Sequence, residues 1–121
     1  MHPAHILFSD SAAPIFLSPV EHYAGNERFI EKALNQQIEL NGAFDITLDL
    51  EDGAGIGQEK QQAKQFGEIL ASERNIYQRL GVRVHDLDSP HFLNDIDEVL
   101  QSGQCAPAYW MIPKITSLQQ A

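Results

Sequence analysis

Cysteine, basic residues and long apolar runs are all scarce in this chain. One cysteine, Cys105, stands among 121 residues, so no disulfide can form within the chain. The 8 Lys and Arg residues face 17 Asp and Glu, and the net charge of -9 leaves too few cations to neutralise nucleic-acid phosphates or to bind an anionic membrane surface. No apolar run is long enough to span a membrane. A secretory signal begins with a basic segment, and here no Lys or Arg precedes Arg28. We therefore expect a cytoplasmic protein with no nucleic-acid or membrane partner.

The rest of the composition is that of an ordinary globular domain, with 43% hydrophobic and 21% charged residues. Short apolar segments alternate with segments of helical periodicity, a pattern that predicts a parallel sheet with helical crossovers. The predicted strands are 13–18, 44–50, 82–85 and 108–113, and the predicted helices are one that begins near Asn26, one over about 58–70 and one over 92–100. In the last helix, Asp95 is expected on the solvent side.

This pattern predicts an α/β fold of parallel (β/α) units. Four such units correspond to half of a (β/α)8 barrel, because a complete barrel needs about 250 residues. We therefore expect residues 1–121 to form a single partial domain, the N-terminal half of a TIM-type (β/α)8 barrel. The alternative is a small flavodoxin-like binding module, but that fold needs a fifth strand, and no strand pattern follows Ser117.

The most informative segment is the end of the second predicted strand. The apolar run there stops at three carboxylates, Asp49, Glu51 and Asp52, and a glycine-rich loop follows. Asp49 and Glu51 are two positions apart, so a strand directs both to one face. Carboxyl ends of parallel strands are where α/β folds place their active sites. The segment predicts an active-site rim, and a plain turn with helix-capping carboxylates stays open as the alternative.

The other predicted strand ends bring further polar side chains to the same rim. Arg83 and His85 are two positions apart on the third strand, and Lys114 follows the fourth. An arginine inside a barrel must be paired, and Asp49 on the neighbouring strand is the natural partner. Such a pair would hold the guanidinium toward a substrate carboxylate or an enolate oxygen. The alternatives are an Arg83 that reaches the surface, a His85 that only hydrogen-bonds at a strand end, and a solvated Lys114.

The remaining motifs predict no separate site. The glycine loop at 53–57 lacks both the GxGxxG spacing and the Lys-Ser/Thr of a phosphate-binding loop. The acidic cluster does not have the spacing of an EF-hand. The other histidines have no metal-binding spacing, and Cys105 is expected to be structural.

Four segments in order carry a family resemblance: NERFIEKAL at 26–34, LDLEDG at 48–53, GVRVH at 81–85 and IPK at 112–114. This succession resembles the HpcH/HpaI aldolase and citrate lyase β-subunit-like family. The resemblance implies a (β/α)8 barrel that uses Mg²⁺ to make or cleave a carbon–carbon bond, commonly in malyl-, citramalyl- or citryl-type CoA thioesters. It spans essentially the whole chain but only the first half of the family barrel.

The resemblance also implies roles for individual residues. Arg83 resembles the arginine that binds the oxo-acid carboxylate or stabilises the enolate, and Asp49 resembles the carboxylate that orients it. Glu51 resembles a residue that reaches metal-bound water, without contacting the metal itself. Asp52, His85 and Lys114 are expected to line the substrate site, and Lys60 resembles a basic position after the acidic loop.

This chain departs from the family pattern at several points. Ala12-Ala13-Pro14 stands where many members have an arginine, and His85 stands where many have an asparagine. Both differences concern the acyl group that is accepted. The family's direct metal ligands come from the fifth and sixth strands, so this chain is expected to supply none of them.

The expected function is that of a Mg²⁺-dependent carbon–carbon lyase, an aldolase acting on a 3-hydroxyacyl-CoA or related hydroxy acid, of which this chain is an N-terminal portion. Magnesium ligands are expected mainly from residues beyond this chain. The expected partners are the small-molecule substrate and either further copies of the chain, as a homo-oligomer, or the missing half of the barrel. The alternative is a catalytically silent half-barrel that serves as an assembly or binding module.

Overall fold

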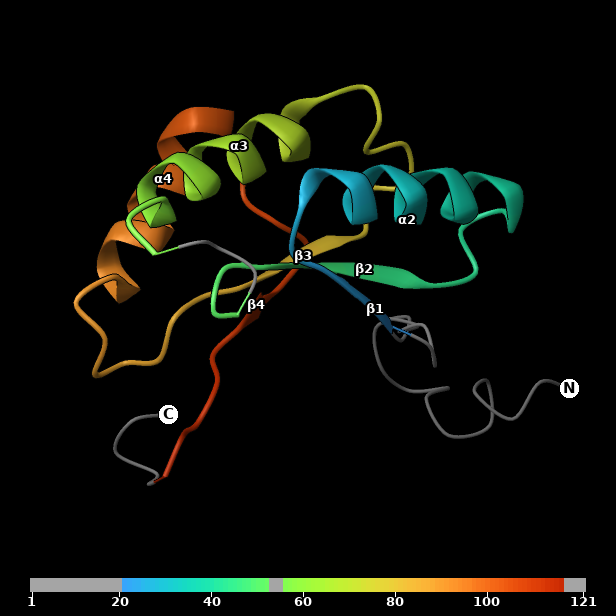
Figure 1. Cartoon of the computed structure of the whole chain (residues 1–121). Helices are drawn as coiled ribbons and strands as arrows, with labels where there is room; N and C mark the ends of the chain where they lie inside the picture. The colour runs from blue at the N-terminus through green and yellow to red at the C-terminus, as the bar shows by residue number, and fades with distance from the viewer. Residues whose placement is uncertain (1–20, 53–55, 117–121) are drawn as a thin grey trace, which may run out of the picture.

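The computed structural model describes residues 21–52 and 56–116, which form alternating strands and helices (Figure 1). The elements are β1 (Glu21–Ala24), α2 (Glu27–Glu39), β2 (Asp45–Asp49), α3 (Glu59–Ala71), β3 (Leu80–Arg83), α4 (Phe92–Gly103) and β4 (Trp110–Met111). Within the described residues the strands form one sheet in the order β1-β2-β3-β4, and every neighbouring pair is parallel.

The three helices cover one face of this sheet (Figure 1). The core lies between the two layers, where Ile46 and Leu48 of β2 and Leu80 and Val82 of β3 have no exposed surface. Sequential strand order with helices on one face is consistent with part of a β/α barrel, whereas a doubly wound sheet carries helices on both faces. None of the helices in the described ranges is long and apolar enough to cross a membrane.

Local sequence explains where the first helix begins and ends. The Asn26 side chain accepts a hydrogen bond from the Phe29 backbone N–H at 3.0 Å, an N-cap that starts α2. The helix stops before Gly42, whose φ of +74° suits glycine. The buried Gln37 amide then donates to the Phe44 carbonyl at 2.9 Å, which ties the end of α2 to the start of β2.

Helices α3 and α4 approach each other at two glycines. A Cβ added at Gly67 would lie 2.5 Å from the Val99 carbonyl oxygen, and one added at Gly103 would lie 2.3 Å from the Gly67 oxygen. Only hydrogen side chains allow the backbones to come this close. The contact packs the C-terminal parts of α3 and α4 against each other.

Most of the predicted elements are confirmed, and one strand was missed. Predicted strands 44–50 and 108–113 contain β2 and β4, and the three predicted helices correspond to α2, α3 and α4. Predicted strand 82–85 is placed too late: it shares residues 82 and 83 with β3, which begins at Leu80. The predicted strand 13–18 lies outside the described residues. The observed Glu21–Ala24 strand contains no apolar run that could have predicted it. It is a strand because its backbone pairs in parallel with β2.

Candidate active site

Arg83 and Asp49 form a bidentate ion pair at the carboxyl ends of β2 and β3. The parallel register places the two residues opposite each other. Arg83 Nε donates to Asp49 Oδ1 at 2.9 Å, and Nη2 donates to Oδ2 at 2.6 Å. The side chains are 22% and 10% exposed, so the pair is largely shielded from water. The predicted pairing is confirmed, and it fixes the plane of the guanidinium.

Two more carboxylates surround the same guanidinium. Asp52 Oδ2 lies 3.3 Å from Arg83 Nη2, and Glu51 Oε1 lies 3.7 Å from Nη1. Asp49 Oδ1 also accepts from the backbone N–H groups of Glu51 and Asp52, which shapes the turn after β2. The hydrogen bonds with Asp49, helped by the charges of Glu51 and Asp52, raise the pKa of Arg83 well above its ordinary value. The guanidinium therefore carries its positive charge at neutral pH.

Lys114 joins the rim through Glu51. Its Nζ lies 3.2 Å from the buried Oε2 of Glu51, and this contact raises the pKa of Lys114 above its ordinary value. Lys114 has a φ of +57°, a conformation that side chains other than glycine adopt at a cost of about 1 kcal/mol and that is common at functional sites. The rim thus combines three carboxylates, Asp49, Glu51 and Asp52, with two cations, Arg83 and Lys114.

His85 is held by Asp95, a residue that was predicted to face solvent. Asp95 was expected on the solvent side of its helix, but its exposed fraction is 0%. Its Oδ2 accepts from the His85 backbone N–H at 2.8 Å and lies 2.6 Å from His85 Nδ1. The expectation failed because Asp95 lies in the first turn of α4, which points at the end of β3. An aspartate in that turn, shortly after a strand-end histidine, is the signal that could have found it.

Two further residues lie around His85. The rings of His85 and His91 have centroids 5.0 Å apart and are tilted by 46°. His91 Nε2 lies 3.8 Å from Glu59 Oε1 at the start of α3. Hydrogen bonds from the backbone N–H groups of Glu59 itself and of Gly57 lower the pKa of the Glu59 carboxyl. The histidine end of the rim is therefore bordered by two carboxylates, Asp95 and Glu59.

A second cross-strand contact was not foreseen from the sequence. The hydroxyl groups of Thr47 and Tyr109 share a hydrogen bond of 2.6 Å. Between them the Tyr109 ring passes over Gly81, where an added Cβ would lie 2.0 Å from Tyr109 Cε2. This contact links β2, β3 and the segment before β4.

An arginine–aspartate pair also occurs at the opposite ends of the same strands. Arg79 Nε donates to Asp45 Oδ1 at 2.6 Å, at the point where β2 begins. Such a pair is thus a way of joining β2 to β3 in this fold, whatever its chemistry. The distinctive feature of Arg83 is its place at the carboxyl end, among Asp49, Glu51 and Asp52.

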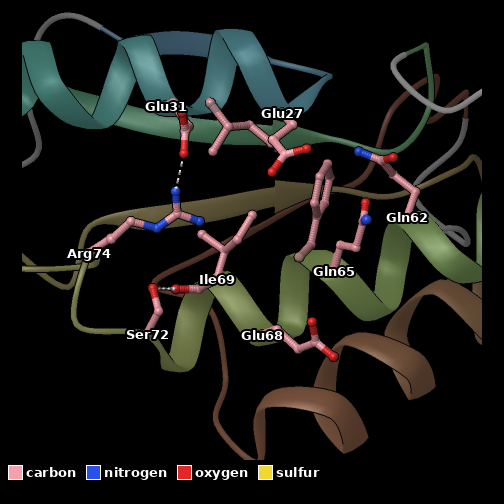
Figure 2. Close-up of a pocket in the computed structure, with 10 residues that line it drawn as sticks. Glu27, Glu31, Gln62, Gln65, Glu68, Ile69, Ser72 and Arg74 are labelled. Atoms are coloured by element: carbon pink, nitrogen blue, oxygen red, sulfur yellow. Dashed lines mark hydrogen bonds and ion pairs between the residues drawn. The ribbon is translucent and has the colours of Figure 1, made fainter.

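Other features lie away from this rim. Lys60 is 74% exposed and pairs with Glu98 of α4 at 3.5 Å. The described residues include no group of three or more His, Cys, Asp or Glu that could hold a metal ion. An open groove of about 320 Å³ runs between α2 and α3, lined among others by Glu27, Glu31 and Arg74 (Figure 2). None of its lining residues belongs to the rim.

One comparison with known proteins gives a match. The chain is similar to the crystal structure of a citrate lyase from Burkholderia xenovorans LB400, with 42% sequence identity and a TM-score of 0.81. The match covers 88% of this chain and 33% of that chain, so this chain spans about a third of the length of that relative. Neither a family model nor a curated protein matches the sequence. The structural match supports the family resemblance carried by the sequence motifs.

Proposed function

We propose that this chain is part of a Mg²⁺-dependent carbon–carbon lyase of the HpcH/HpaI and citrate lyase β-subunit-like family. Its substrate would be a 3-hydroxyacyl-CoA or a related hydroxy acid of the citryl, malyl or citramalyl type. One observation carries the proposal: the Arg83 guanidinium, held by Asp49 at the carboxyl ends of parallel strands. The 42% identity to a citrate lyase supports it.

In this proposal Arg83 and Asp49 act together. Asp49 binds Nε and Nη2 of the guanidinium, and Glu51 lies on the Nη1 side. A substrate carboxylate drawn to this cation would gain a charge-assisted interaction at low entropic cost, because the guanidinium is already fixed. Cleavage places negative charge on the departing acyl unit, and a cation fixed beforehand stabilises such charge without reorganisation. Asp52 and Lys114 would set the charge around the bound substrate, and His85 would line the same site.

The described residues do not by themselves fit a magnesium site. Asp49 is paired with Arg83, and Glu51 lies between Arg83 and Lys114. No third ligand joins them in the described part of the chain. Magnesium, which the family resemblance implies, would therefore need carboxylate ligands mainly from outside this chain, with Glu51 nearby.

We also propose that residues 1–121 are the N-terminal half of a barrel in a cytoplasmic protein. In the described residues β1 and β4 are edge strands, and β4 pairs with β3 only through Trp110 and Met111. Edge strands present unpaired backbone groups that favour association. The missing half or a second copy of the chain would cover them. The same open edges favour the second candidate, a catalytically silent half-barrel used for assembly.

The test compares two arginines of one strand region in the full-length natural protein. Arg83→Ala should abolish lyase activity, whereas Arg79→Ala should lower stability and keep the activity, because Arg79 lies at the amino end of the sheet. Retained activity in Arg83→Ala would refute the assigned role. The intact mass of the natural gene product separates the two candidates: a mass well above 13.5 kDa supports the lyase, and a mass of 13.5 kDa favours the assembly module.

A further inference from the structure

Met111 lies beside Arg83 on the face of the sheet opposite the helices (Figure 1). The parallel register pairs Arg83 with Asp49 on one neighbouring strand and with Met111 on the other. Val82 and Val84, on either side of Arg83 in the sequence, are fully buried in the core. Because successive side chains of a strand alternate between faces, Arg83 and its two partners point away from that core. Arg83 is therefore flanked by a carboxylate on the β2 side and by a thioether on the β4 side.

The Tyr109 ring supports this orientation and occupies the next row of side chains. Tyr109 stands two residues before Met111, so both side chains belong to the same face. Its ring lies where a Cβ of Gly81 would point, since such an atom would be 2.0 Å from Tyr109 Cε2. Gly81 stands two residues before Arg83, so the ring fills the row directly on the amino side of the Arg83 row. Met111 and Tyr109 are both partly exposed among the described residues, and together they form an apolar side of the site.

The carboxylates of the rim gather on the β2 side of Arg83. Asp49, Glu51 and Asp52 belong to the end of β2 and the turn after it, and their oxygens lie 2.6, 3.7 and 3.3 Å from the guanidinium nitrogens. Lys114 follows β4, but its Nζ lies 3.2 Å from Glu51 Oε2. Both cations of the rim are thus paired with carboxylates of the β2 side.

A hydroxy acid held by Arg83 would therefore meet different chemistry on its two sides. Neighbouring strands lie about 4.8 Å apart, so a substituent one or two bonds from a carboxylate at Arg83 reaches the Met111 side chain. A hydrogen or a short alkyl group at that place gains from contact with the apolar side chain. A second carboxylate there would lose water, although both rim cations are already paired, and it would add to the negative charge of the rim.

We propose that Met111, with the Tyr109 ring in the adjacent row, forms the specificity-determining side of the substrate site; this rests on the proposed function. The hydroxyl-bearing carbon of the preferred substrate carries one carboxylate, held at Arg83, and a hydrogen or a methyl group, which faces Met111. This choice favours malyl and citramalyl thioesters. It disfavours a citryl thioester, in which a carboxymethyl group takes the place of the hydrogen or the methyl group.

The experiment measures kcat/KM of the full-length natural protein with the CoA thioesters of malate, citramalate and citrate. In the wild type, the better of the first two should exceed citryl-CoA by about tenfold or more. Met111→Lys places a cation beside Arg83 and should raise the ratio of citryl to citramalyl cleavage by about tenfold. Met111→Leu keeps the apolar side and should keep the wild-type ratio. Ile76→Lys adds the same charge in the exposed loop before β3 and is the matched control, which should also keep that ratio.

The outcomes separate this inference from the proposed function. A wild type that prefers citryl-CoA overturns the inference and leaves the lyase assignment standing, and this comparison needs no variant to fold. A merely structural Met111 would change the cleavage of all three thioesters alike, so a folded Met111→Lys with the wild-type ratio overturns its role. An equal shift in Ile76→Lys also overturns it, because the effect would then be one of overall charge. A wild type that cleaves none of these thioesters or the corresponding acids overturns the proposed function and this inference with it.

Discussion

At the scale of single residues, position decides the role of a side chain more than its type does. Arg79 and Arg83 both pair with an aspartate of β2, at the amino and the carboxyl end of the sheet respectively. Asp49→Asn should lower the free energy of unfolding by about 2–3 kcal/mol, because it breaks a largely buried charged pair. Asp45→Asn, in a more exposed pair, should cost about 1–2 kcal/mol. Urea unfolding measures both, and only Asp49→Asn should also reduce lyase activity; equal activity in the two variants would contradict the assignment.

Gly81 is the residue whose lack of a side chain matters most to the rim. Gly81→Ala places a Cβ 2.0 Å from the Tyr109 ring and must displace it from Thr47. We expect a loss of about 2–4 kcal/mol, from overpacking together with a broken hydrogen bond. Tyr109→Phe, which removes the hydroxyl alone, should cost only about 1 kcal/mol. Thermal unfolding tests the difference, and a Gly81→Ala protein as stable as Tyr109→Phe would show that the ring moves aside freely.

At the scale of elements, the α3–α4 contact depends on two glycines. Gly67→Ala should destabilise the fold by about 1–2 kcal/mol, because the overpacking cost exceeds the gain of about 1 kcal/mol in helix propensity. Gln61→Ala on the exposed side of α3 is the control and should change stability by less than about 0.5 kcal/mol. Urea midpoints measure both. A stabilised Gly67→Ala would mean that the helices separate without strain.

The start of α3 gives a pH dependence with a defined sign. The pKa of the Glu59 carboxyl lies below its ordinary value of 4.5, because backbone N–H groups at the helix start bind the charged form. Its stabilising contribution is therefore complete above pH 4.5 and is lost as the pH falls through the lowered pKa of the folded state. Glu59→Gln should be less stable than wild type at pH 7, and the difference in the free energy of unfolding should shrink as the pH falls below 4.5. A difference of the same size at pH 7 and in acid would contradict this.

At the scale of the whole molecule, the open sheet edge should govern association. The β4 edge carries partly exposed apolar side chains, among them Trp110 and Ile112. The 121-residue chain should therefore associate, and light scattering should give a mass above 13.5 kDa. Ile112→Lys places a charge at this edge and should shift the population toward the monomer, whereas Ile76→Lys, exposed in the loop before β3, should not. A wild-type chain that is monomeric at high concentration would contradict the proposed association.

The sequence alone determined all of the described elements except β1, and one ion pair. Apolar periodicity places β2, β3, β4 and three helices, and the two-residue alternation along strands is enough to pair Arg83 with Asp49. These features are local, or depend only on the rule that neighbouring parallel strands end at the same edge. The short β1 and the burial of Asp95 were decided by the tertiary structure, as was the Thr47–Tyr109 bond. Each depends on which segment, distant in sequence, the helical crossovers bring to a given face of the sheet. The hydrogen-bonded partners of these side chains are 10 and 62 residues apart, and the periodicity of a sequence does not reveal contacts over such separations.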